Sequence, residues 1–341
     1  MAGFSAKVIK WQKSQGRHDL PWQIDPSPYK VYVSEIMLQQ TQVTTVIPFF
    51  KRFAKRFPDI KKLARAHEDT VMSLWSGLGY YRRAINLHRS AKIILKEHRG
   101  LVPDRLEALL SLPGVGDSTA GAILSLGYQK YGVITDGNVR RLFARHFMIG
   151  GDLTRSPHQA VFMDLTKREM PEGDFRAYSQ GVMDLGATVC TKTSPRCGIC
   201  PLNKTCLSYQ SDSVNLYPVK AKKKSTARAK NVYGLLLLNK EGHTVYLQKR
   251  DRQSFWPGRY CIPLFDNQRS MREFIKNLKG DPMPMEGSAD NILNFKFSHM
   301  NLSIRLVHYA TDHEDSHFLS RDKIMTLDIP KKIKRTIIGG L

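Results

Sequence analysis

The sequence predicts a multidomain protein in which an all-α region of about 210 residues precedes a smaller mixed α/β unit. Apolar side chains recur at helical spacing up to about Tyr209, whereas short strand-like segments dominate after a basic stretch. A length of 341 residues allows two or three packed units, and an apolar fraction of 41% is enough to build their cores. We therefore expect separate folded domains rather than a disordered chain.

The first region is expected to contain several amphipathic helices. Ser27 before Pro28 is typical of a helix start, so a helix is predicted from there to about Gln42. The segment 112–116 is a tight turn between two helices, and Asp136 precedes a helix over 139–147. Two further faces have apolar side chains at helical spacing: Phe4, Val8 and Trp11, and Ala84, Leu87, Ala91 and Ile94.

The composition changes after the helical region. Turn-forming residues and the run Lys222–Lys224 indicate an exposed basic linker over about 218–230. Cys261 lies in a strand-like stretch, and we expect it to be a small buried apolar residue. Strands are predicted at 233–238, 244–248 and 295–309, the last with a bend near Met300.

The charge indicates a polyanionic partner. The 53 Lys and Arg residues exceed the 30 Asp and Glu residues, for a net charge of +23. The surplus is +11 in residues 1–100, +1 in 101–200 and +11 in 201–341. Nucleic acid is the first candidate and an anionic membrane surface the second. No apolar run approaches the roughly 18 residues of a membrane helix, and no secretion signal is visible, so we expect a cytoplasmic protein.

Four cysteines form one dense group, which predicts a metal site rather than disulfides. Their spacing is C-x6-C-x2-C-x5-C, and four thiolates suit either tetrahedral zinc or a [4Fe–4S] cluster. Only the two central cysteines form a C-x2-C knuckle, so a single compact loop suits an iron–sulfur cubane better than a zinc ribbon. The four residues are Cys190, Cys197, Cys200 and Cys206.

Together with the turn at 112–116 and Asp136, this cysteine group resembles the endonuclease III superfamily of base-excision DNA glycosylases. Within that superfamily, several segments are similar to the signatures of the MutY-type adenine DNA glycosylases. The resemblance is strong over residues 5–217 and weaker in the C-terminal unit. The similar segments are Ser34–Gln42, Gly77–Arg82, Asp136–Val139 and Met183–Ala187.

The resemblance implies a domain arrangement and a cofactor. Residues 1–217 are expected to form an all-α helix-hairpin-helix catalytic region, with a [4Fe–4S] cluster on the four cysteines. Within it, a six-helix barrel is expected over about 26–134, and a cluster domain from about 1–25 plus 135–217. Residues 231–341 are expected to form an α/β Nudix-like domain that recognises 8-oxoguanine.

Two carboxylic acids are the candidate catalytic groups. Glu35 lies in an otherwise apolar run, where burial raises a carboxyl pKa and suits a general acid, although a lone Glu is more often a solvated residue on a polar face. Asp136 is, taken alone, an ordinary helix N-cap. The resemblance implies that Glu35 protonates N7 of adenine and that Asp136 stabilises the oxocarbenium-like sugar, with Asn138 positioning the site.

The candidate DNA contacts come from three segments. The turn and the start of the following helix contribute Leu112, Gly114, Gly116 and Ser118, and the glycines let backbone N–H groups approach a phosphate. The resemblance implies that Gln40 and Tyr80 enter the base stack as wedges when adenine is flipped out, and that Gln42 contacts DNA beside them. Ordinary packing is the alternative for Gln40 and Tyr80, and a plain glycine turn between helices is the alternative for the segment 112–116.

Position 118 decides between two reaction types. Bifunctional relatives carry a Lys there, whose amine forms the Schiff base needed for strand cleavage. Here the residue is Ser118, which cannot form an imine, so a monofunctional glycosylase is expected. The family also has Tyr at this position in some members, and often Arg where this chain has Gln23 after Pro21–Trp22. A charged contact near the adenine pocket is therefore replaced by a neutral one.

In the C-terminal unit, Phe297, Ser298 and His299 match the family's 8-oxoguanine recognition loop, although a plain strand is the default interpretation of three such residues. No Nudix hydrolase box is visible between Pro263 and Asn291, so this unit is expected to hydrolyse nothing.

The overall hypothesis is a monomeric adenine DNA glycosylase of base-excision repair, acting on adenine opposite 8-oxoguanine or guanine in double-stranded DNA by base flipping. It would work near the bacterial nucleoid and away from membranes. Two alternatives stay open: an endonuclease III-like glycosylase/lyase for oxidised pyrimidines, and a zinc-stapled DNA-binding protein without catalysis.

Overall fold

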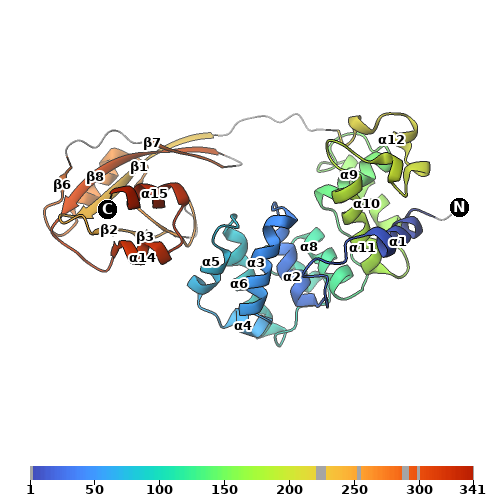
Figure 1. Ribbon diagram of the computed structural model, residues 1–341, viewed down its shortest axis with the longest axis horizontal. Coiled ribbons are helices and arrows are strands. Elements are labelled where there is room, and N and C mark those ends of the chain that lie inside the picture. The colour runs from blue at the N-terminus through green and yellow to red at the C-terminus, as the bar shows by residue number, and fades with distance from the viewer. Residues whose placement is uncertain (1–2, 220–227, 252–254, 286–291, 298–299, 341) are drawn as a thin grey trace. The chain divides into compact units, whose positions relative to one another are not determined.

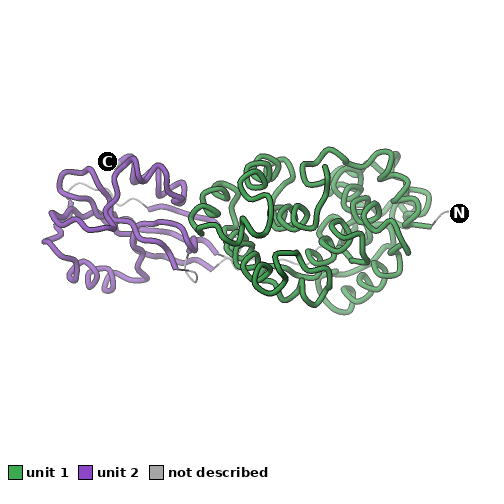
Figure 2. Tube along the Cα trace, turned by 90° about the horizontal axis from the view of Figure 1, so that it is seen from below, with its two compact units in different colours: residues 1–222 green, residues 223–341 purple. Residues whose placement is uncertain are grey.

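A computed structural model describes residues 3–219, 228–251, 255–285, 292–297 and 300–340. It divides the chain into two units, residues 1–222 and 223–341, each of which is described by itself (Figure 2). The first unit is built from helices and the second from a sheet with helices, so the predicted fold class is confirmed. No helix in these described ranges has both the length and the apolar character that a membrane span requires.

The helices of the first unit follow one another through short connections (Figure 1). α8 and α11 each continue into one π-helical turn, Ile123–Gly127 and Leu185–Val189. The cysteine region adds three short 3₁₀ turns, Cys197–Ile199, Asn203–Thr205 and Val214–Leu216. The α-helices are α1 Phe4–Gln15, α2 Pro28–Leu38, α3 Val43–Arg56, α4 Ile60–Ala64, α5 Glu68–Trp75, α6 Arg82–Glu97, α7 Leu106–Leu110, α8 Asp117–Ala122, α9 Gly137–His146, α10 His158–Arg168, α11 Phe175–Asp184 and α12 Leu207–Gln210.

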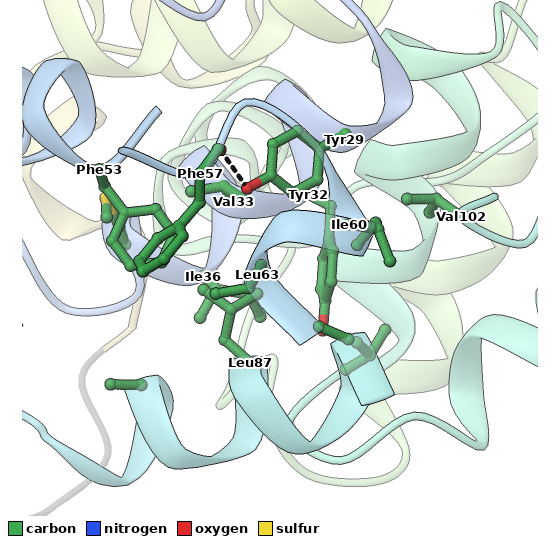
Figure 3. Close-up of a cluster of buried hydrophobic side chains, with 14 of the residues drawn as sticks. Tyr29, Tyr32, Val33, Ile36, Phe53, Phe57, Ile60, Leu63, Leu87 and Val102 are labelled. Carbon is green, nitrogen blue, oxygen red and sulfur yellow. Dashed lines mark hydrogen bonds between the residues drawn. The ribbon is translucent and has the colours of Figure 1, made fainter. Parts of the chain in front are cut away.

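Two hydrophobic cores organise this unit. The first joins α2 to α8 and includes the aromatic cluster around Phe53, where the Tyr29 hydroxyl donates to the Phe57 carbonyl oxygen at 2.7 Å (Figure 3). The second joins α1 to α9, α10 and α11. Helix α2 belongs to both, because Val31 packs in the second core and Ile36 in the first. The apolar run that predicted a buried helix is therefore the shared wall of two cores.

Helix α2 starts as predicted but ends earlier. The Ser27 side chain accepts from the Lys30 amide and Pro28 occupies the first turn, which confirms the predicted start. The predicted end near Gln42 is wrong, since α2 ends at Leu38 and Gln40 has the left-handed φ of 57°. The Arg83 side chain binds the last carbonyl groups of the helix and takes the place of a further turn.

A glycine pair lets the backbone before Asp136 lie directly on α8. A Cβ on Gly121 would meet the Val133 carbonyl oxygen at 2.0 Å, and one on Gly132 would meet the Gly121 carbonyl oxygen at 2.4 Å. Side chains are excluded at both positions because the two main chains touch. This contact fixes where the segment leading to Asp136 leaves the first core.

The second unit contains a seven-stranded sheet and a two-stranded one. Strand order in the larger sheet is β6-β8-β1-β2-β9, with β5 also paired to β1 and β7 to β8, and β3 pairs β4 in the small sheet. The elements are β1 Arg228–Asn239, β2 Thr244–Tyr246, β3 Gln248–Lys249, β4 Tyr260–Cys261, β5 Leu264–Phe265, α13 Gln268–Lys276, β6 Met283–Pro284, β7 Ile292–Lys296, β8 Met300–Thr311, β9 Phe318–Ser320, α14 Arg321–Thr326 and α15 Lys331–Gly340.

Strand β1 is apolar on both faces because helices cover both sides of the sheet. Leu235 and Leu237 pack with residues of α13, whereas Leu236 and Leu238 pack with residues of α14 and α15. β1 and β8 are parallel over their full length, from Arg228 opposite Met300 to Asn239 opposite Thr311. Cys261 is fully buried, as predicted.

Two strand boundaries differ from the sequence prediction. β1 begins at Arg228, inside the stretch expected to be linker, because its first residues pair with β8. The predicted strand 295–309 is an antiparallel pair, β7 and β8, with Lys296 opposite Asn301. The predicted single strand with a bend is therefore wrong, because its two parts run antiparallel to each other.

We predict that Gly121→Ala lowers the free energy of unfolding by about 2–3 kcal/mol, because the added methyl group overlaps a backbone carbonyl that cannot move away alone. The measurement is urea unfolding of the full chain followed by far-UV circular dichroism. Gly173→Ala is the matched control, since a Cβ there meets no atom within 4 Å. Equal midpoints for the two variants would contradict the close contact.

Candidate functional site

Two carboxyl groups of the first unit, on α2 and at the start of α9, interact electrostatically. Glu35 projects from α2 and is half-buried. Burial, with a smaller contribution from the charge of Asp136, raises the pKa of the Glu35 carboxyl to about 8. A carboxyl with such a pKa is largely protonated at neutral pH and is able to donate a proton.

Asp136 is held as a hydrogen-bond acceptor at the start of α9. Its Oδ1 accepts from the Val139 amide at 2.8 Å, so Asp136 is the N-cap that the sequence alone suggested. Its Oδ2 accepts from Asn138 Nδ2 at 3.1 Å. Two N–H donors directed at the two oxygens suit a carboxylate rather than a carboxylic acid. The two carboxyl groups therefore have different environments, burial for Glu35 and N–H donors for Asp136.

A chain of hydrogen bonds leads from Asp136 to the cysteine loop. Asn138 Oδ1 accepts from Arg141 Nη2 at 2.8 Å, and Arg141 Nε donates to the Cys190 carbonyl oxygen at 2.8 Å. Arg141 Nη2 also donates to the Gly186 carbonyl oxygen at 2.6 Å. Gly186 has no room for a side chain because its Cβ would lie 2.7 Å from that of Asn138.

Ser118 contacts the main chain just before Asp136. Its Oγ accepts from the Thr135 amide at 3.0 Å. The Thr135 carbonyl oxygen accepts from Arg140 Nε at 2.8 Å, so both sides of this residue are held by side chains. The Ser118 hydroxyl therefore holds the backbone of the residue before Asp136. The sequence did not indicate this role.

A cavity of about 270 Å³ lies beside α2. Val31 and Ser34 of α2 line it, and Val31 is one helical turn before Glu35 on the same face. Trp22 and Gln23 also line it, and both polar atoms of the Gln23 amide are buried without a hydrogen-bond partner in the described structure. Buried amide groups normally have hydrogen-bond partners, which makes this side chain a candidate ligand-binding group.

The opposite wall of this cavity comes from α11. Gln180 lines the cavity and donates from Nε2 to Asp184 Oδ1 at 2.9 Å. Asp184 is fully buried and accepts from the Arg17 amide and guanidinium, which ties the segment after α1 to α11. This arrangement explains the aspartate of the Met183–Ala187 segment as a structural residue.

The four clustered cysteines line one cavity and form no disulfide. Burial raises the pKa of Cys200 to about 12, so thiolates here need a positive partner. Arg145 supplies one, since its Nη1 lies 3.4 Å from Cys190 Sγ and donates to the Thr191 carbonyl oxygen at 2.7 Å. Across the described residues, no group of three or more His, Cys, Asp or Glu side chains is placed to hold a metal ion.

The candidate DNA-contact residues are exposed at the ends of helices. Gln40 follows α2, Tyr80 precedes α6 with half of its surface exposed, and Gln42 is the exposed N-cap of α3. In the turn, Leu112 is buried, whereas Gly114 has the positive φ of 83° and is exposed together with Gly116. The buried Leu112 side chain therefore anchors the turn, whereas the backbone of the two glycines is exposed to solvent.

The candidate 8-oxoguanine loop is described only in part. Phe297 follows β7, and its amide donates to the Met300 carbonyl oxygen at 2.8 Å. Its ring stacks on Phe255 with 6.2 Å between centroids. Ser298 and His299 lie outside the described residues.

Sequence reasoning missed three arginines that organise the site: Arg83, Arg141 and Arg145. Each binds several backbone carbonyl groups, and such acceptors leave no trace in a sequence. One signal was available, because Arg141 and Arg145 are four residues apart and therefore share a face of the helix that follows Asp136.

Comparison with known proteins identifies relatives of both sequence and fold. Residues 33–168 match the family described as HhH-GPD superfamily base excision DNA repair protein. An adenine DNA glycosylase from Buchnera aphidicola subsp. Acyrthosiphon pisum is 39% identical over 303 residues, covering 88% of this chain and 85% of that protein. The adenine DNA glycosylase of Rattus norvegicus is 39% identical over 219 residues, covering 62% of this chain and 42% of that protein.

The solved structures agree on the fold of the helical unit. A thermostable thymine-DNA glycosylase is 26% identical with a TM-score of 0.55, covering 61% of this chain and 95% of that one. An endonuclease III–DNA complex, at 19% identity and a TM-score of 0.51, shares the fold over 61% of this chain and 94% of that one. By its extended similarity to the Buchnera protein, the chain belongs to the adenine DNA glycosylase family of base-excision DNA repair enzymes, which are hydrolases of N-glycosyl bonds.

Proposed function

We propose that this protein removes adenine paired with 8-oxoguanine or guanine from double-stranded DNA, as a monofunctional glycosylase that extrudes the base. The observation that carries the proposal is the pairing of Glu35, whose pKa is raised to about 8, with the hydrogen-bonded Asp136. A proton donor beside a carboxylate is the pair of groups that glycosidases use to break a glycosidic bond.

Glu35 is the proposed general acid. Cleavage of the N-glycosidic bond leaves electrons on the adenine, and a proton at N7 makes the base a neutral leaving group. Glu35 is able to donate this proton at neutral pH because burial keeps its carboxyl protonated. A solvated Glu would have lost the proton already.

Asp136 is the proposed stabiliser of the positive charge that develops on the deoxyribose. Its two oxygens are oriented by Val139 and Asn138, and Asn138 is oriented by Arg141. A carboxylate that is already in place lowers the barrier without reorganisation during the reaction. Ser118 and Arg140 hold the preceding residue and support the same orientation.

The cavity beside α2 is the proposed receptor for the extruded base. Trp22 supplies apolar surface, and the partnerless amide of Gln23 offers one donor and one acceptor. A purine edge carries the complementary groups, and Gln pairs with adenine in this bidentate way elsewhere. A neutral amide at this position leaves the pocket without the positive charge that an arginine would bring.

DNA binding is proposed to rest on the turn around Gly114 and on the exposed Gln40 and Tyr80. The glycine backbone is free to donate to a phosphate, and the two side chains are placed to enter the base stack. Recognition of 8-oxoguanine by residues 297–299 rests on the sequence match alone. A single chain contains every proposed catalytic residue, so we propose a monomer.

A [4Fe–4S] cluster is the proposed cofactor. Cys190, Cys197, Cys200 and Cys206 would hold it, and their shared cavity with the Arg145 guanidinium at Cys190 Sγ fits a group of thiolate-bound iron. When bound, such a cluster would cross-link the loop that ends at Cys206. Through Cys190 and Arg141, the loop in turn supports Asn138.

The gel assay for strand cleavage separates this function from its main alternative. With a duplex containing adenine opposite 8-oxoguanine, we expect the labelled strand to stay intact until alkali is added, because Ser118 provides no amine for a Schiff base. A duplex with thymine opposite adenine is the control. Cleavage without alkali, or release of an oxidised pyrimidine in preference to adenine, would favour an endonuclease III-like glycosylase/lyase.

The rate of base release is expected to fall as pH rises through about 8, by about tenfold per unit above it, because only protonated Glu35 is competent. Glu35→Gln is expected to lose about 10²–10⁴-fold in single-turnover rate and to lose this pH dependence. Glu97→Gln, an exposed residue at the end of α6, is the matched control. A wild-type rate that stays flat to pH 10 would contradict the acid role.

The purified protein is expected to be brown and to contain about four irons per chain. Cys197→Ser is expected to lose iron and colour, whereas Cys261→Ala is expected to keep both, because Cys261 lies buried in the other unit. Iron and zinc content and the visible spectrum are the measurements. A colourless, fully active protein loaded with zinc would overturn the cluster assignment.

A further inference from the structure

The two exposed wedge candidates share an unusual backbone conformation. Gln40 has a φ of 57° and Tyr80 a φ of 49°, both in the left-handed region that residues with a Cβ rarely adopt. They lie 40 positions apart in the sequence, on segments that leave α2 and enter α6. Strained residues of this kind persist only when their surroundings hold them in place.

One side chain holds the first of these segments. Arg83 Nη1 donates to the carbonyl oxygens of Ile36, Met37 and Gln39 at 3.0, 2.6 and 2.6 Å. The first two carbonyl groups belong to the last turn of α2 and the third to its C-cap residue, where no helical donor remains. The guanidinium thereby fixes the peptide that immediately precedes Gln40.

The same guanidinium holds the second segment. Arg83 Nη2 donates to Thr41 Oγ1 at 3.0 Å and to the Gly79 carbonyl oxygen at 3.1 Å. One guanidinium therefore binds the residues on both sides of Gln40 and the residue before Tyr80. The Arg83 guanidinium carbon also lies 5.3 Å from the centroid of the Tyr80 ring and 5.5 Å from that of Trp75. Cation–π attraction therefore adds to the hydrogen bonds.

Arg83 is buried, and within the described ranges no carboxylate forms a salt bridge with it. Burial lowers its pKa to about 10, which leaves the guanidinium charged at neutral pH. A planar fork with several fixed donors is able to bind two separate segments at once, whereas an ammonium is a single point of attachment.

We propose that Arg83 is a positioning residue that joins Gln40 and Tyr80 into one rigid unit, so that both side chains enter the base stack together when adenine is extruded. This inference rests on the proposed function, because it assigns the two residues to base extrusion. Arg83 itself touches neither the base nor the reacting sugar. Its effect is therefore expected on extrusion and not on cleavage of the glycosidic bond.

The test compares two duplexes that differ in how firmly adenine is stacked. One carries adenine opposite 8-oxoguanine, and the other carries adenine opposite an abasic spacer, where extrusion costs less. We expect Arg83→Met to lower the single-turnover rate at least about tenfold on the first duplex, equivalent to roughly 1.4 kcal/mol. On the second duplex we expect a loss of less than about threefold, measured below the unfolding temperature of the variant.

A second readout and a second variant keep the test independent of folding. With 2-aminopurine in place of adenine, wild-type protein is expected to raise the fluorescence on binding, and Arg83→Met at saturating protein is not. Arg83→Lys is expected to share both defects, since it retains the charge but not the fork. Arg89→Met, an exposed residue of the same helix, is expected to match the wild type.

Each other outcome contradicts the inference. Equal losses on both duplexes would assign Arg83 a general structural role, and a wild-type-like Arg83→Lys would assign the effect to charge alone. No loss in either variant would remove the role altogether. Failure of the wild-type protein to release adenine from either duplex would instead overturn the proposed function. The test thus distinguishes failure of the proposed function from failure of the role of Arg83.

Discussion

The site depends on keeping a protonated carboxyl next to a carboxylate. Glu35 needs burial to keep its proton, and it lies on α2, the helix that packs in both cores through Val31 and Ile36. Asp136 needs donors, and it finds them at the start of α9, where backbone N–H groups have no helical partner. The boundary between the two cores satisfies both needs at once. The helical architecture thus places two unlike environments close enough for the charge of Asp136 to influence Glu35.

The second core contributes order rather than chemistry. From Asp136 the hydrogen bonds run through Asn138 and Arg141 to the carbonyl group of Cys190, so the geometry of the carboxylate is linked to the fold of the cysteine loop. Gly186 and Gly121 extend this control, because close contact at each leaves no space for adjustment. Disorder in the cysteine loop would change the orientation of the Asp136 carboxylate through these contacts. The loop would not have to contact DNA to have this effect.

Much of this organisation was predictable from sequence, and the limits have physical causes. Local signals were reliable: the Ser27–Pro28 helix start, the buried faces of α1 and α6, and the change to an α/β unit are confirmed. The apolar run around Glu35 correctly indicated a raised pKa. What failed depended on distant partners. The end of α2 is set by Arg83, 44 positions beyond Gln39, and the division of the predicted strand 295–309 is set by antiparallel pairing of β7 with β8. The role of Ser118 at Thr135 was invisible for the same reason.

The environment of Arg83 has a consequence for how the protein responds to ionic strength. Its acceptors are carbonyl oxygens, a hydroxyl and the faces of two aromatic rings, and none of them carries a charge that counter-ions would screen. DNA association, in contrast, is driven by exposed cations and weakens steeply as salt rises. We therefore expect the segments of Gln40 and Tyr80 to keep their conformation across salt concentrations that change DNA occupancy by orders of magnitude. Salt concentration sets the fraction of protein bound to DNA. The uncharged dipoles and π faces around Arg83 set the conformation of the segments that contain Gln40 and Tyr80.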